Sequence, residues 1–218
     1  MEPQSKLSKS MKMISNYMMC DCVSLETIII PDNITVIGKF AFSGCTSLTQ
    51  APVLPATTLQ EYCYYFMFNG CSALTEITIP KSVTSIGGYA FSNCSSLTTV
   101  TIPKNVTKIG NSAFPGCTSL TSINIPESVT TIGEEAFNSC TGLTNITIPN
   151  NVKSIGEAAF RYCTSLSTVV MSEYINKIYS YAFEGCPSLK KIYFPISLSE
   201  IDSMAFYNTG ITTVLFIF

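Results

Sequence analysis

The chain has 218 residues, of which 46% are hydrophobic and only 12% are charged, and its formal net charge is −2. This composition excludes an intrinsically disordered chain, which has too little apolar surface to offset the entropy lost on folding. It also argues against nucleic-acid binding, because the sequence has no concentrated basic segment to displace counterions from phosphates.

The sequence contains no histidine. Catalytic triads that use an imidazole base and metal sites with imidazole ligands are therefore excluded. We expect a protein without catalytic residues, without a metal site and without a cofactor.

Residues 1–10 are expected to form an N-terminal tail. The segment up to Cys20 has scattered lysines and methionines rather than the continuous apolar block of a signal peptide. No apolar run in the chain reaches the roughly 18 to 20 residues of a membrane-spanning helix. The chain is therefore either cytoplasmic or has a targeting segment outside the printed sequence.

An internal repeat begins at about residue 11. Its most regular mark is a cysteine followed three residues later by a leucine. The spacing between these cysteines is 23 residues, except for an interval of 26 in the unit at 45–70. The repeating cysteines are Cys22, Cys45, Cys71, Cys94, Cys117, Cys140, Cys163 and Cys186.

Each unit divides into two parts. The Leu-x-x-Ile-x-Ile part alternates with period two, which predicts a short half-buried strand. A proline follows in most units and ends the strand, because it cannot donate a hydrogen bond. The Ile-Gly-x-x-Ala-Phe part has helix-like spacing, so short helical or irregular segments are expected on the convex side. About nine strands are expected, centred near Ile29, Val53, Thr78, Thr101, Asn124, Thr147, Val170, Tyr193 and Leu215.

A unit of this size cannot bury its own apolar side chains, so neighbouring units must stack. Stacking pairs the strands in parallel through right-handed crossovers. We predict an α/β repeat solenoid that forms a single domain over residues 11–218, with a partial first unit. The last unit is uncapped and ends in an apolar strand at 214–218, so homo-association through this strand is expected.

The repeated pattern Cys-Thr-Ser-Leu-Thr-x-Ile-x-Ile-Pro-x-x-Val-x-x-Ile-Gly-x-x-Ala-Phe resembles the BspA-type leucine-rich repeat. The resemblance covers residues 11 to 217. It implies a surface-exposed or secreted protein of host-associated bacteria or protozoa, with a role in adhesion and protein binding. The expected partner is a protein or glycan on a host or neighbouring cell.

The repeating cysteines are expected to stack in the core as buried free thiols, since cysteine behaves as a small apolar residue. Disulfides between adjacent coils are disfavoured, because parallel stacked side chains do not easily reach the required torsion. Cys20 and Cys22 lack a second pair of ligands, so they are a weak signal for zinc.

Two positions of each strand point away from the core and form a Thr-rich concave face. Threonine pairs on neighbouring strands stabilise a sheet, which gives these residues a structural explanation. The functional alternative is a flat, nearly uncharged surface for a ligand. The candidate ligand-binding residues are Thr99, Thr101, Ser122, Asn124, Asn145, Thr147, Val170, Lys191, Tyr193 and Leu215.

Near the C-terminal end of this face, Val170, Lys191, Tyr193 and Leu215 form a candidate amphipathic patch, with Lys190 beside them. Exposed tyrosine and aliphatic side chains are typical interface anchors. Alternatively, Tyr193 and Leu215 are covered by further repeats or by a second copy of the chain.

Two other groups of residues have a structural interpretation. In the longer unit, Met67 and Phe68 take core positions, and Tyr62, Tyr64 and Tyr65 are expected to pack over the inserted residues. The adjacent carboxylates Glu134 and Glu135 are expected on the solvated convex side, without a cleft that would make them catalytic.

The sequence therefore favours a non-catalytic binding module that uses the concave face for adhesion or protein binding. The alternative is a structural spacer, one segment of a longer stalk with no ligand of its own. An enzyme ranks behind both.

Overall fold

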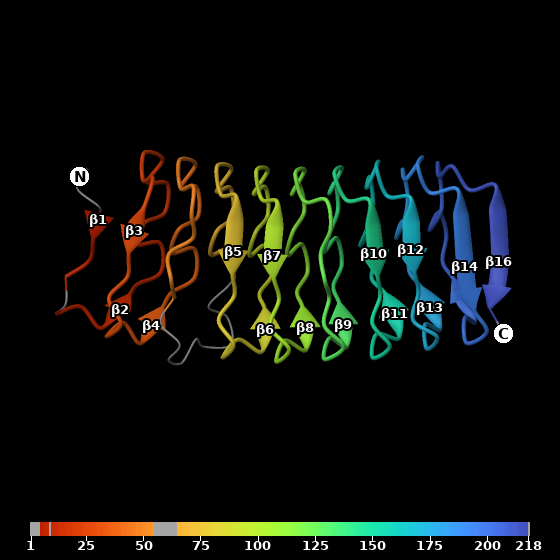
Figure 1. Ribbon diagram of the computed structural model, residues 1–218, viewed down its shortest axis with the longest axis horizontal. Coiled ribbons are helices and arrows are strands. Elements are labelled where there is room, and N and C mark those ends of the chain that lie inside the picture. Colours follow the sequence, from red (N-terminus) through yellow and green to blue (C-terminus); the bar gives the residue numbers. More distant parts are fainter. Residues whose placement is uncertain (1–4, 9, 55–64, 218) are drawn as a thin grey trace.

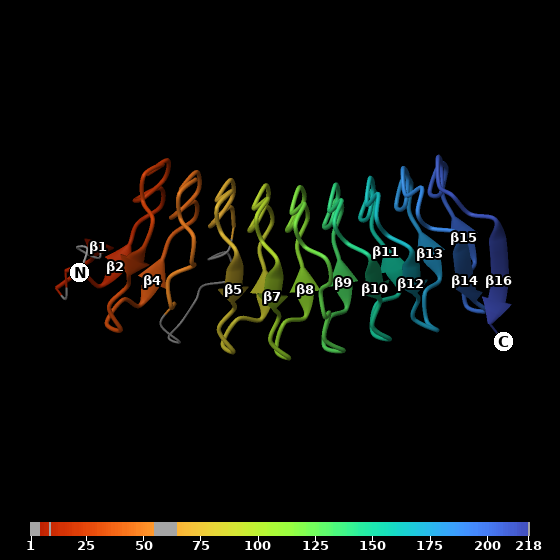
Figure 2. The ribbon, with the colours of Figure 1, turned by 45° about the horizontal axis from the view of Figure 1, so that its top comes forward.

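The structure, a computed structural model, describes residues 5–8, 10–54 and 65–217. The chain winds into coils that stack along one nearly straight axis, with the two termini at opposite ends (Figure 1, Figure 2). Within the described residues, no helix is long and apolar enough to cross a membrane.

The strands lie in two rows along the axis, called ladders below. Within the described residues each ladder is divided into short sheets of two or three strands, and every hydrogen-bonded pair of strands is parallel. The first ladder comprises β1 (Ser5–Lys6), β3 (Ile28–Ile29), β5 (Glu76–Thr78), β7 (Thr99–Thr101), β10 (Asn145–Thr147), β12 (Thr168–Val170), β14 (Lys191–Pro195) and β16 (Thr213–Ile217). The second comprises β2 (Met13–Ile14), β4 (Val36–Ile37), β6 (Ser85–Ile86), β8 (Lys108–Ile109), β9 (Thr131–Ile132), β11 (Ser154–Ile155), β13 (Lys177–Ile178) and β15 (Glu200–Ile201).

The first ladder follows the predicted strand positions except at two of them. The segments around Val53 and Asn124 are extended without forming a strand. In addition, β1 lies in the segment that we expected to be a tail, and it pairs with β3. The outward surface of this ladder and of segment 121–125 is called the strand face below, and it is the face that we predicted as concave.

The sequence analysis missed the second ladder. Its strands have only two residues, and in most of them an isoleucine is buried beside a more exposed neighbour, as in β8 and β9. This alternation is too short to be separated from helical spacing by periodicity, which explains why the ladder was not predicted.

The predicted helical segments on the convex side are wrong, because the structure has turns there and no helix among the described residues. Backbone N–H groups of alternate residues bond to the next coil, as from Tyr89 to Asn111 O (3.1 Å) and from Phe91 to Ala113 O (2.8 Å). Two positions per coil, four residues apart, also have left-handed φ, as at Ala158 (51°) and Tyr162 (59°). A right-handed helix tolerates neither feature, so the fold is a parallel β-solenoid of about eight turns rather than an α/β solenoid.

The core is a set of columns in which each residue type stacks on its equivalent in the next coil. Consecutive phenylalanine rings lie 5.1 to 5.8 Å apart between centroids and are nearly parallel. The column contains Phe42, Phe68, Phe91, Phe114, Phe137, Phe160, Phe183 and Phe206. Met67 and Phe68 are fully buried, which confirms their predicted core positions.

The longer unit shifts the register of its own first half. Pro52 is equivalent in the repeat to Ile29 and Thr78, which point outward, but it is buried, and Val53 beside it is 88% exposed. The alternation therefore slips by one residue after Gln50, as extra residues in a strand commonly cause. Tyr62 and Tyr64 lie outside the described residues.

Candidate binding surface

All ten predicted ligand-binding residues are exposed. Thr99 and Thr101 lie on β7, Ser122 and Asn124 on the extended segment that follows, and Asn145 and Thr147 on β10. The strand pairing places Thr147 beside Val170 of β12 and Tyr193 of β14 beside Leu215 of β16. The structure therefore brings them into two rows along one face.

A neighbouring column of hydroxyl residues has a structural role. The hydroxyl of Thr98 donates to Thr75 O at 3.0 Å, and the hydroxyl of Thr144 donates to Thr121 O at 3.1 Å. Each bond ties one coil to the previous one. Within the described residues, the hydroxyls of Thr99 and Thr101 make no such bond, which leaves these two available to a ligand.

The first ladder is interrupted at several places in the described chain, and one of them lies between β12 and β14. The bonds of the adjacent coils connect Ser167 N–H to Thr144 O (2.9 Å) and Thr212 N–H to Lys190 O (2.9 Å). No equivalent bond from Lys190 N–H to Ser167 O is present among the described residues. In this coil Pro187, which has no N–H and no hydroxyl, occupies a position where most other coils have serine or threonine.

The interruption produces a groove of about 470 Å³. Its lining combines hydroxyl, apolar and cationic side chains and includes much of the predicted amphipathic patch. The lining residues are Ser167, Thr168, Val169, Val170, Met171, Ser188, Lys190, Lys191 and Tyr193. Leu215 of the predicted patch lies on the next strand and does not line the groove.

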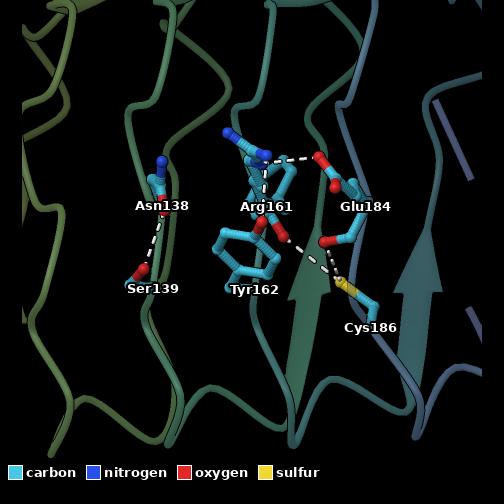
Figure 3. A network of polar contacts seen from close by, with 7 residues as sticks. Asn138, Ser139, Arg161, Tyr162, Glu184 and Cys186 are labelled. Atoms are coloured by element: carbon cyan, nitrogen blue, oxygen red, sulfur yellow. Dashed lines mark hydrogen bonds and ion pairs between the residues drawn. The ribbon is translucent and has the colours of Figure 1, made fainter. Parts of the chain in front are cut away.

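A second polar cluster lies on the turn segments, around the only arginine of the chain (Figure 3). Arg161 Nε lies 2.6 Å from Glu184 Oε2, and Arg161 Nη2 donates to the Tyr162 hydroxyl at 2.9 Å. The guanidinium also lies over the rings of Tyr162 and Tyr181. Hydrogen bonding to Glu184 raises the pKa of Arg161, against the smaller effect of burial. The charges of this cluster satisfy each other, so its role is to connect coils.

The repeating cysteines are buried from Cys45 to Cys186, as predicted, whereas Cys20 and Cys22 are half-buried. The thiols of the buried cysteines also donate to a main-chain carbonyl of an earlier coil, as from Cys117 Sγ to Phe91 O (3.1 Å) and from Cys140 Sγ to Phe114 O (3.2 Å). The column thus contributes hydrogen bonds that the sequence analysis did not predict. Cys63 lies outside the described residues.

Glu134 and Glu135 are exposed on the turn segments, in the solvated position that we expected. Ser112 Oγ donates to Glu135 Oε2 at 3.2 Å. In the described part of the chain, no cluster of three or more histidine, cysteine, aspartate or glutamate residues could hold a metal ion.

An aromatic column on the turn segments was missed by the sequence analysis. Tyr17, Phe40, Phe66 and Tyr89 stack with centroid distances of 4.4 to 4.5 Å. All four have left-handed φ and occupy one repeat position. Tyr65 packs edge-on against Phe66 at 4.9 Å. The signal was an aromatic residue just before the Ala-Phe pair, which we did not consider separately.

Solved structures with similar coils are leucine-rich repeat proteins. The chain is similar to a leucine-rich repeat protein of T. pallidum, with 27% identity, a TM-score of 0.55, and coverage of 84% of this chain and 76% of that one. It is also similar in fold to a leucine-rich repeat protein from Bacteroides ovatus, with 22% identity, a TM-score of 0.51, and coverage of 94% and 84%. A search of curated proteins gives no match.

The model of the BspA-type leucine rich repeat region matches in six copies, over residues 3–98 and 108–217. These ranges include almost all of the described coils. The match confirms the resemblance inferred from the repeated cysteine, leucine and Ala-Phe positions. The chain belongs to the BspA-type leucine-rich repeat family.

Proposed function

We propose that the chain is a non-catalytic binding module of the cell surface, which contacts a protein or glycan partner through the strand face. The observation that carries this proposal is the two rows of ten exposed and almost uncharged side chains, three of which line the groove beside β12. Val170 and Tyr193 are 52% and 42% exposed there, and tyrosine is enriched among the residues that contribute most to binding at interfaces.

Family membership supports the protein-binding and surface parts of the proposal. Repeat proteins stack similar units so that one long surface becomes available to a partner. An adhesive role for the strand face extends this reasoning to a partner on a host or neighbouring cell.

The experiment compares two variants of the purified chain on a panel of immobilised host extracellular proteins and glycans, using surface plasmon resonance. Tyr193→Ala together with Lys191→Ala changes the strand face. Tyr207→Ala changes an exposed tyrosine of the turn segments and is the control. We expect the first variant to lose at least about tenfold in affinity for the bound panel member and the control to keep it.

The second candidate function is a structural spacer. It is favoured by the hydroxyl column and the continuous phenylalanine stack, because both stabilise the array without a ligand. A spacer would bind no panel member, or would bind it equally well with either variant, and that result would reject the strand face as a binding surface.

A further inference from the structure

The charges on the strand face are separated by position. Glu26 and Glu76 lie in the N-terminal half, whereas Lys190 and Lys191 are adjacent in the groove beside β12. In the coils between them, the two outward rows contain threonine, serine, asparagine and valine. Another lysine of the same ladder, Lys6 of β1, is in register with Ile29 at the opposite end. The groove therefore holds two adjacent lysines within an otherwise uncharged stretch of the face.

The two groove lysines differ from the paired cations elsewhere in the chain. Arg161 pairs with Glu184, and Lys177 pairs with Glu200 at 2.8 Å. No carboxylate lies within ion-pair distance of Lys190 or Lys191 in the described part of the chain. Neither ammonium group is therefore neutralised by a carboxylate of this part of the chain, and Lys190 Nζ lies close to Gly210 of the following coil.

The groove also offers uncharged donors. The N–H of Lys190 lacks the inter-coil bond that most of its equivalents make, as does the N–H of Thr121, and within the described residues the Thr168 hydroxyl makes no hydrogen bond. By contrast, the Ser188 hydroxyl is already used, because it donates to Thr164 O at 2.7 Å. The free groups on the groove walls are therefore mostly donors, which favours an acceptor-rich ligand.

The shape and the apolar lining favour a polypeptide. Val170 and Met171 line the groove from the side of β12, and Tyr193 lines it from β14, two residues after Lys191. A wall of five strand residues is about 16 Å long, which matches an extended segment of about five residues. An extended main chain can also use main-chain groups that the interrupted ladder leaves unpaired.

We propose that the groove between β12 and β14 binds an extended acidic peptide segment of the partner, with its carboxylates on Lys190 and Lys191 and its apolar side chains on Val170 and Tyr193. This inference rests on the proposed function, since it specifies the partner chemistry of one part of the strand face.

The test is selection of a random ten-residue peptide library, displayed on phage, against the immobilised full chain. Recovered peptides are synthesised with a fluorophore, and their affinity is measured by anisotropy. The variants are Lys190→Ala with Lys191→Ala, and a control pair, Lys104→Ala with Lys153→Ala, which removes two exposed lysines away from the strand face.

We expect the selected peptides to combine aspartate or glutamate with apolar residues. The groove variant should bind them about tenfold more weakly and the control variant equally well, because each exposed ion pair contributes a few-fold in affinity. Binding should also weaken when NaCl is raised from about 0.05 M to about 0.5 M.

Three outcomes would overturn the inference. The first is selected peptides without acidic enrichment, and the second is acidic peptides that bind the groove variant as well as the original chain. The third is a library without binders together with lysine-dependent binding of sulfated or sialylated glycans on an array, which would assign the groove to an anionic sugar. None of these outcomes rejects the strand face as a binding surface, which the Tyr193 experiment tests separately.

Discussion

The repeating cysteine combines two properties at one position. Its side chain is small enough to stack in the crowded core, and its thiol donates a second hydrogen bond to a carbonyl that already accepts from a backbone N–H of its own coil, as Phe91 O accepts from Cys94 N–H (3.2 Å). Serine could donate in the same place, but it would bury a more polar group. This combination explains why cysteine recurs although no disulfide is needed.

The buried thiols make stability sensitive to alkaline pH. Burial raises the pKa of Cys45 from 9.0 to about 11 and that of Cys186 to about 12, and it raises the pKa of Cys117 well above 9.0. Below pH 9 the thiols are protonated in both states, so they add no pH dependence. Above pH 9 the unfolded chain loses protons that the folded chain keeps, and the free energy of unfolding should fall by about 1.4 kcal/mol per pH unit for each such thiol.

The measurement is urea unfolding, followed by circular dichroism, from about pH 8 to about pH 10.5. Cys117→Ala is the matched variant. It should be less stable by about 1 to 2 kcal/mol at pH 8, and its stability should fall less steeply above pH 9, by the contribution of one thiol. Equal slopes for the two chains would contradict the assignment of this pH dependence to buried thiols.

At the scale of the element, the turn segments determine how one coil stacks on the next. Their backbone alternates between bonds to the next coil and bonds within the turn, as at Phe91 and Cys94. Left-handed φ at two positions four residues apart reverses the chain within a few residues. The position just before the cysteine holds glycine in several coils, as at Gly116 (φ 71°), and other residues elsewhere, as at Asn93 (φ 58°) and Tyr162 (φ 59°).

Glycine substitutions at Ala158 and Ala159 distinguish this turn from a helix. Ala158 has a φ of 51°, where a side chain costs about 1 to 2 kcal/mol, whereas Ala159 does not have left-handed φ and is fully buried. Ala158→Gly should therefore raise the free energy of unfolding by up to about 1 kcal/mol. Ala159→Gly should lower it by about 1 kcal/mol or more. Thermal unfolding of both variants gives the comparison, and destabilisation of equal size would indicate a helix instead.

At the scale of the whole molecule, the stack exposes apolar groups on its last strand. Val214 and Phe216 of β16 are 47% and 62% exposed, and β16 pairs with β14 along one edge. Exposed apolar edge strands pair with other chains, so homo-association through β16 remains our prediction.

Phe216→Lys should shift the 218-residue chain toward the monomer, because a charge on an edge strand opposes pairing. Light scattering over a concentration series measures the mass. Val53→Lys, at an exposed position far along the axis, is the control and should leave the mass unchanged. A monomer at all concentrations before any substitution would reject association through β16.

The repeat unit, the buried columns and seven of the nine strand positions follow from the sequence alone. Apolar positions that recur every 23 residues can be buried only by stacking, and that constraint needs no knowledge of the turns. The ten exposed side chains on one face follow from the same period-two alternation. The tertiary structure decided what local spacing could not: the turns in place of helices, the second ladder, the register slip at Pro52, and the groove beside β12. Each of these depends on hydrogen bonds between coils. A single unit contains the main-chain donors and acceptors but not their partners, so its sequence does not show which of them are paired.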